Sequence, residues 1–125
     1  MEVKEKIEKS IPNFGAKEVF IQVISNLKKS GIEIPKNLVE RINEEEWDSK
    51  GEPSERIKDI QRKIKSIIKK IIKKEIGLKE KEINRILDKF NAKEDGFTEI
   101  WKIFQLYIHL KDEKMLDKMI KNLYS

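Results

Sequence analysis

Residues 96–111, GFTEIWKIFQLYIHLK, form the stretch that decides the fold class of this chain. At about 100° per residue, its apolar side chains cover well over half of the circumference of a helix. They are Phe97, Ile100, Trp101, Ile103, Phe104, Leu106, Tyr107, Ile108 and Leu110. A helix that is apolar on most sides must be surrounded by other elements that keep water away from it. The stretch therefore predicts a central helix at residues 97–110.

The segments on both sides of this stretch also repeat apolar residues at helical spacing. Residues 16–27 place them at i, i+3, i+4 and i+7, and Gly31 can close that helix in the left-handed conformation. Pro12 should end a short first helix, and Pro35 suits the first turn of a third, which should end near Trp47. The expected helical segments are residues 3–11, 16–27, 35–47, 54–76, 83–90, 97–110 and 115–123.

The fold class that follows is all-α, because no segment alternates apolar and polar residues with the period of a strand. A chain of 125 residues fits one domain. The clearest break is DSKGEP at residues 48–53, a loop between two helical halves, and Asp95 could cap the helix that follows it at residue 97. We expect a compact single-domain array of six or seven helices over residues 1–125, with one long basic amphipathic helix.

That long helix contains RKIKSIIKKIIKKEI at residues 62–76, where isoleucines and lysines alternate in pairs. On a helical wheel the isoleucines fall on one face, and a row of cations falls on the opposite face. We call this row the lysine ridge; it consists of Lys58, Arg62, Lys65, Lys69 and Lys73. Lys63, Lys70 and Lys74 flank it. The ridge should be roughly 22 Å long at 1.5 Å per residue, enough to follow several successive phosphates.

The net charge of the protein is concentrated in this helix. Residues 54–76 carry nine Lys or Arg against three Asp or Glu, a net +6, whereas the whole chain has a net charge of +5. This asymmetry favours a non-catalytic module that binds the phosphate backbone of RNA or DNA, as a small subunit of a ribonucleoprotein or DNA-handling complex. Five phosphate contacts predict a salt slope of roughly −3.5 for single strands and −4.5 for duplexes.

Two other interpretations of the basic helix stay open. The chain has 24 Lys against four Arg, a bias that places lysines on solvated faces without any binding function. Binding to a membrane surface is disfavoured, because no Trp or Phe lies between Trp47 and Phe90 to anchor the helix at an interface. Because Lys65 and Lys69 lie opposite the isoleucine face, reversing their charge should lower the affinity for nucleic acid and barely change the melting temperature.

A second class of function is protein–protein interaction. An acidic segment precedes the loop, and it could bind a basic partner or neutralise the basic helix of its own chain; its acids are Glu40, Glu44, Glu45, Glu46, Asp48 and Glu52. The central apolar helix could likewise be an interface or support a homodimer. The alternative function is therefore an adaptor, inhibitor or oligomeric scaffold, of the kind that phages and mobile elements encode.

Catalytic, metal and cofactor sites find no support in the sequence. There are no cysteines, and the EF-hand outline around Gly96 places Lys93 and Lys102 where calcium needs oxygen ligands. His109 is the only histidine, without a nucleophile at a recognisable spacing, so His109→Ala should leave activity intact. No apolar run has the length of a signal peptide or a membrane span, so we expect a cytoplasmic protein without cofactors that is not an enzyme.

Overall fold

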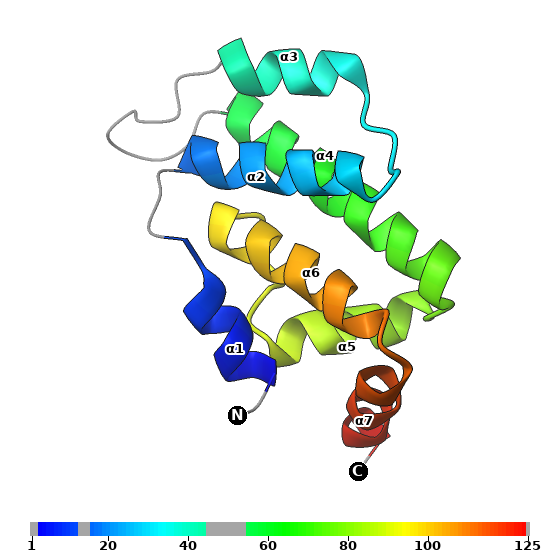
Figure 1. The fold of residues 1–125 in the computed structure, drawn as a ribbon. Helices are drawn as coiled ribbons and strands as arrows, with labels where there is room; N and C mark the ends of the chain where they lie inside the picture. Colours follow the sequence, from blue (N-terminus) through cyan, green and yellow to red (C-terminus); the bar gives the residue numbers. More distant parts are fainter. Residues whose placement is uncertain (1–2, 13–15, 45–54, 125) are drawn as a thin grey trace.

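The computed structural model describes residues 3–12, 16–44 and 55–124, and this part of the chain is all-α, as predicted (Figure 1). It contains seven α-helices and one π-helical turn and no strand. The elements are α1 (Val3–Ser10), α2 (Ala16–Lys29), α3 (Lys36–Glu44), α4 (Glu55–Ile71), η1 (Ile72–Ile76), α5 (Glu80–Lys89), α6 (Phe97–Leu110) and α7 (Glu113–Tyr124). The predicted loop at residues 48–53 and the predicted helix end near Trp47 lie outside the described residues.

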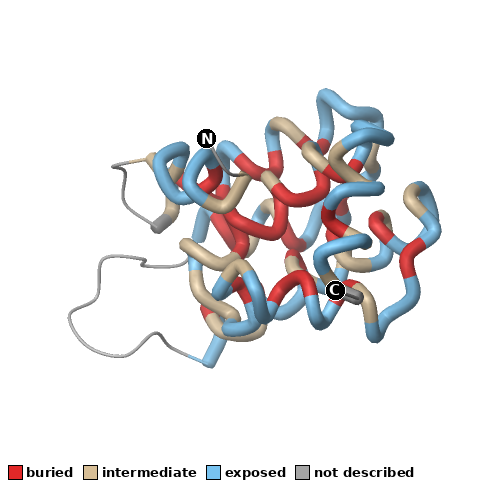
Figure 2. Tube along the Cα trace, turned by 90° about the horizontal axis from the view of Figure 1, so that it is seen from below, coloured by how far each residue is buried: buried red, intermediate tan, exposed pale blue. Residues whose placement is uncertain are grey.

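Helix α6 occupies the centre of the array, which confirms the prediction from its apolar circumference. It packs against α1, α2, α4 and α7, and eight of its 14 residues are buried. Figure 2 shows the buried parts of the chain gathered in the interior, with exposed turns around them. Two apolar residues of α6 are exceptions, because Phe97 and Ile108 remain 37% and 39% exposed.

Helix α4 turns its isoleucine face to α6, as its period predicts. Five isoleucines of α4 and η1 are buried, namely Ile57, Ile60, Ile64, Ile68 and Ile72. The expected uniform α-helix instead ends in the π-helical turn η1, where the Gly77 N–H donates to the Ile72 carbonyl at 3.2 Å. The wider turn holds Ile76 against the core, and Gly77 closes it with φ of 81°. A left-handed residue at this position favours glycine.

The helix ends test two further predictions. Gly31 closes α2 with φ of 82°, and the Ile32 N–H donates to the Leu27 carbonyl at 3.0 Å, as the predicted left-handed cap requires. The prediction that Asp95 caps the start of α6 is wrong. The cap position is Gly96, without a side-chain hydrogen bond, because the Asp95 carboxylate lies 3.1 Å from Lys65 Nζ of α4 instead.

Arg41 of α3 makes two hydrogen bonds to α4, one to the Arg56 carbonyl at 3.3 Å and one to Asp59. Arg41 Nη1 donates to Asp59 Oδ2 at 2.9 Å, and Lys63 Nζ lies 3.2 Å from the same oxygen. The hydrogen bond from Arg41, followed by that from Lys63, holds the pKa of Asp59 below its ordinary value of 3.8. A carboxyl whose pKa is lower in the folded protein than in the unfolded chain stabilises the fold at pH values above its unfolded pKa. This stabilisation is lost as the pH falls through the pKa of the folded protein.

We therefore expect Asp59→Asn to lower the melting temperature at pH 7 and to have progressively less effect below about pH 4. Thermal unfolding of both proteins between pH 7 and pH 2 measures this difference. Asp117→Asn, at an exposed position of α7, is the matched control for removing one carboxylate. A difference between wild type and Asp59→Asn that stays constant down to pH 2 would contradict the role of the Arg41 contact.

Candidate nucleic-acid interface

Helix α4 brings most of the lysine ridge into one surface groove of about 270 Å³. The groove lies between α4, the start of α5 and the turn that precedes α6. We call it the cationic groove; it is lined by Arg62, Lys65, Ser66, Lys69, Lys70, Lys73, Glu80 and Asp95. Four of the five predicted ridge residues are among them, and Lys70, predicted as a flanking residue, joins them. Lys58 lies one turn before the groove.

The cations of the groove outnumber its carboxylates. Five Lys or Arg side chains face it against Glu80 and Asp95, which leaves a net charge of +3. Lys70 is exposed, and no ion pair joins it to another residue in the described part of the chain. A concave surface lined by one sign of charge concentrates its field and attracts counterions. The groove is therefore suited to an extended or compact anion.

Lys65 differs from the ridge residue that the sequence predicted. Its side chain is only 15% exposed, because the turn before α6 covers it. Lys65 Nζ lies 3.1 Å from Asp95 Oδ1 and donates to the Lys93 carbonyl. The structure therefore changes the expectation for this residue, and reversing Lys65 should lower the melting temperature. A glutamate there would face the Asp95 carboxylate and the Lys93 carbonyl with little water between them.

The other ridge cations have weaker partners at the surface. Lys69 Nζ donates to Asn84 Oδ1 at 3.1 Å, and Lys73 Nζ lies 3.5 Å from Glu80. At the other end Lys58 and Arg62 share Glu55, at 3.6 and 4.0 Å. The Glu55 side chain is 84% exposed, and exposed pairs of this kind contribute only about 0–1 kcal/mol. A phosphate can therefore replace these carboxylates at small cost.

The acidic segment does not neutralise the ridge within the described residues. Glu40 and Glu44 of α3 make no ion pair with α4 in this part of the chain. The ion pair between the two helices has the opposite polarity, with Arg41 on α3 and Asp59 on α4. The other members of the predicted acidic segment, Glu45, Glu46, Asp48 and Glu52, lie outside the described residues. The charge of the cationic groove is therefore reduced chiefly by its own Glu80 and Asp95.

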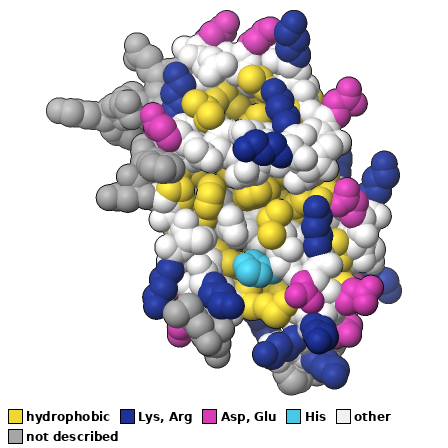
Figure 3. Space-filling model, in the orientation of Figure 1, with side chains coloured by type: hydrophobic (Ala, Val, Ile, Leu, Met, Phe, Trp, Pro, Cys, Tyr) yellow, Lys and Arg dark blue, Asp and Glu magenta, His cyan; other side chains and the backbone are white. Residues whose placement is uncertain are grey.

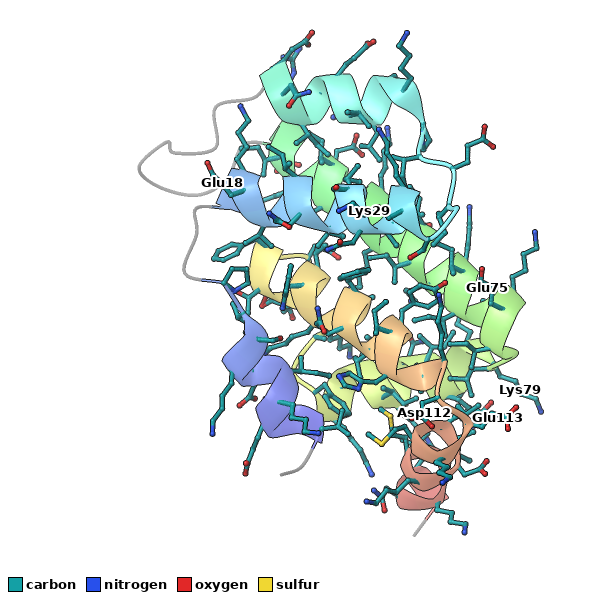
Figure 4. All side chains as sticks on the ribbon, in the orientation of Figure 1. Glu18, Lys29, Glu75, Lys79, Asp112 and Glu113 are labelled. Atoms are coloured by element: carbon teal, nitrogen blue, oxygen red, sulfur yellow. The ribbon has the colours of Figure 1, made fainter. Side chains whose placement is uncertain are left out.

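A second polar cluster, which the sequence did not indicate, joins α6 to η1. Tyr107 is buried, and its hydroxyl donates to the Glu75 carboxylate, while Lys111 Nζ lies 4.4 Å from the centre of its ring. Burial first, and then the hydrogen bond to Glu75, raise the pKa of Tyr107 above its ordinary value. Figure 4 shows Glu75 near the end of the long helix. The phenol stays protonated and acts as a donor that links two helices.

The described residues contain no group of three or more His, Cys, Asp or Glu side chains that could hold a metal ion. His109 is partly buried on α6. None of the helices in the described ranges is long and apolar enough to cross a bilayer. The cationic groove, which contains most of the lysine ridge, is the candidate binding site for an anionic partner.

Comparison of the chain with protein families, with curated proteins and with solved structures found no match to any of them.

Proposed function

We propose that this protein is a non-catalytic helical module that holds nucleic acid by its phosphate backbone in the cationic groove. Its setting would be the cytoplasm, as a small subunit of a ribonucleoprotein or DNA-handling complex. The observation that carries the proposal is the convergence of five cations on one groove that holds only two carboxylates. Phosphate neutralisation by Lys and Arg supplies most of the affinity in binding of this kind.

The composition of the groove favours contacts to the backbone over contacts to bases. None of the described residues that line it is aromatic, so it offers no platform on which a base could stack. The groove contains more lysines than arginines, and arginine is the residue whose planar guanidinium group forms paired hydrogen bonds with the edge of guanine. Binding should therefore depend little on sequence.

The salt dependence of binding tests the proposal and counts the cations that take part. If Glu80 and Asp95 keep neutralising two of the five cations, the slope of log affinity against log salt should be roughly −2 for single strands and −2.7 for duplexes. Five phosphate contacts would give the steeper values of roughly −3.5 and −4.5. Fluorescence anisotropy with labelled RNA, single-stranded DNA and duplex DNA between about 25 and 200 mM KCl measures the slope. If none of the three nucleic acids binds at the lowest salt concentration, the proposed function is wrong.

Asp95→Asn should raise the affinity for nucleic acid. The substitution removes the carboxylate that lies 3.1 Å from Lys65, so the groove gains one unit of positive charge. The salt slope should steepen by about 0.7 to 0.9, and the affinity at low salt should rise several-fold. Asp88→Asn, on the exposed side of α5 and away from the groove lining, is the control for net charge. An equal gain in both variants would show that only the total charge matters.

The alternative function is a protein–protein interaction module that works through the face of α2 and α6. Figure 3 shows apolar side chains on this face. Both helices carry large apolar residues that are exposed, namely Ile21 on α2 and Phe97 and Ile108 on α6. This interpretation is supported by their position on two helices that pack together. The absorbance of the purified protein at 260 and 280 nm, combined with its mass in solution, separates the two functions. Bound nucleic acid favours the first, and a clean homodimer favours the second.

A further inference from the structure

A second and larger groove, of about 810 Å³, lies between α1, α5 and α7, away from the lysine ridge. We call it the terminal groove, because the first and last helices form its walls. Its apolar surface comes from all three helices and consists of Val3, Ile86, Phe90, Met115, Met119 and Leu123. In Figure 1, α1 and α7 lie on either side of α5 near the two ends of the chain.

Four lysines line the terminal groove, and none of the described residues that line it is acidic. They are Lys4 and Lys6 on α1, Lys89 on α5 and Lys118 on α7. Lys89 Nζ donates to the Asn122 carbonyl at 2.7 Å and so ties α5 to α7. The other three make no ion pair within the described ranges of the chain. The groove therefore combines an apolar surface with positive charge on two opposite walls.

The wall formed by α7 has the repeat of a helix-packing surface. Its lining residues Met115, Lys118, Met119, Asn122 and Leu123 recur at i, i+3, i+4, i+7 and i+8. This stripe is about 12 Å long at 1.5 Å per residue, which corresponds to two or three turns of a partner helix. Such stripes are the surfaces on which a neighbouring helix packs its own side chains.

We propose that the terminal groove binds an acidic amphipathic helix of a partner protein. The apolar side of that helix would rest on the partly exposed Met115, Phe90 and Leu123, with Met119, which is 8% exposed, beneath them. Carboxylates on its two flanks would reach Lys6 of one wall and Lys118 of the other. Methionines adapt their shape to an incoming side chain, which suits a docking surface. An apolar helix face in a groove with matching charges on its rim is a recurrent mode of peptide recognition.

The distribution of charge favours a helix over a small amphiphile. A fatty acid has one carboxylate and could meet the lysines of one wall only. An amphipathic helix carries acids on both flanks, so it can neutralise Lys4 and Lys6 together with Lys118. This inference is independent of the proposed function, because none of the residues that line the terminal groove belongs to the cationic groove.

A synthetic peptide tests the proposal with the intact protein. The probe is a capped peptide of about 15 residues, with leucines at i, i+3, i+4 and i+7 and glutamates on both flanks. We expect it to shift the methyl NMR signals of Met115 and Met119 and to gain helicity on binding. A peptide with lysines in place of the glutamates should bind at least about ten-fold more weakly, because like charges would then oppose one another.

Matched variants locate the binding surface. Lys6→Glu combined with Lys118→Glu should weaken binding of the acidic peptide by about ten-fold, as expected for two rim contacts. Lys36→Glu combined with Lys81→Glu changes the net charge equally at exposed positions outside the groove and should have less than about a two-fold effect. Met115→Gln keeps the size of the side chain and removes its apolar end, so it should weaken binding without unfolding the protein. Circular dichroism confirms the fold of each variant.

Four results would overturn the proposal. One is equal binding of the acidic and basic peptides, and another is an equal loss in the two charge-reversal pairs. A third is tighter binding of laurate than of the peptide at the same methionine signals, which would assign the groove to a small amphiphile. The last is a shift of those signals with protein concentration alone, which would assign it to a second copy of the chain. Retention of peptide binding by Lys69→Glu keeps this test separate from that of the cationic groove.

Discussion

Trp101→Ala should lower the free energy of unfolding by about 3–5 kcal/mol, as expected for truncating a buried aromatic side chain. Trp101 is only 9% exposed, although it lies on the side of α6 next to the short helix α1. Its ring meets the ring of Phe104 edge to face at 6.1 Å. Its Nε1 donates to Ser10 Oγ at 3.1 Å, so one side chain both fills the core and holds the end of α1. The truncation would leave a cavity and remove the hydrogen bond that ties the end of α1 to α6.

Two control variants separate these contributions. Ser10→Ala removes the hydrogen-bond partner of Trp101, together with the bond that Ser10 Oγ donates to the Ile7 carbonyl, and should cost about 0.5–1.5 kcal/mol. Phe97→Ala removes an aromatic ring from the same helix at a position that is 37% exposed, and it should cost less than about 1 kcal/mol. Urea denaturation followed by circular dichroism measures all three. A loss below about 1 kcal/mol for Trp101→Ala would mean that α6 is not the central helix.

The features that the sequence predicted correctly are those that depend on local spacing. The apolar circumference of α6, the stripe of α2 and the isoleucine face of α4 each follow from a helical period within one segment. Gly31 follows from the need for a left-handed residue after the last turn of α2. Each of these rules concerns residues fewer than about ten positions apart, so one segment contains all the information that they need.

The features that the sequence could not predict depend on which segments meet in space. Lys65 and Asp95 are 30 positions apart, and only the turn before α6 brings the carboxylate over the ridge, which also removes Asp95 from the cap of α6. Tyr107 likewise pairs with Glu75, 32 positions away, and Glu75 lies in a π-helical turn that a regular helical wheel does not include. The terminal groove has the same origin, because its walls are α1 and α7 at opposite ends of the chain.

These long-range contacts change which lysines are informative in a binding experiment. The ridge taken from a helical wheel treats its five cations as equivalent, whereas the structure divides them by exposure. Lys65 is mostly covered and has two acceptors, so its replacement would disturb the fold and the charge together. Lys69 has one surface acceptor, Asn84, and Lys70 is exposed. Changes at these two positions alter the charge of the cationic groove with the least effect on packing.

We therefore expect Lys69→Glu combined with Lys70→Glu to lower the affinity for nucleic acid by a factor on the order of 100 at low salt. The two reversals change the net charge of the groove from +3 to −1, so it would repel the phosphates that it is proposed to hold. The loss should be similar for every sequence tested, and the salt slope should flatten, because the lost contacts are to the backbone. The melting temperature should change little, since neither side chain is part of the core.

Lys114→Glu combined with Lys121→Glu is the matched control, with the same change in net charge on exposed positions of α7. Neither residue lines the cationic groove, so this pair should lower the affinity by only a few-fold, through long-range repulsion of the phosphates. Salt at about 150 mM should screen most of that effect. If the two pairs bind RNA and DNA equally well, the position of the lysines on α4 has no role in binding. The lysines would then serve only to keep one face of an amphipathic helix in water, and the exposed apolar face of α2 and α6 would be the surface to test next.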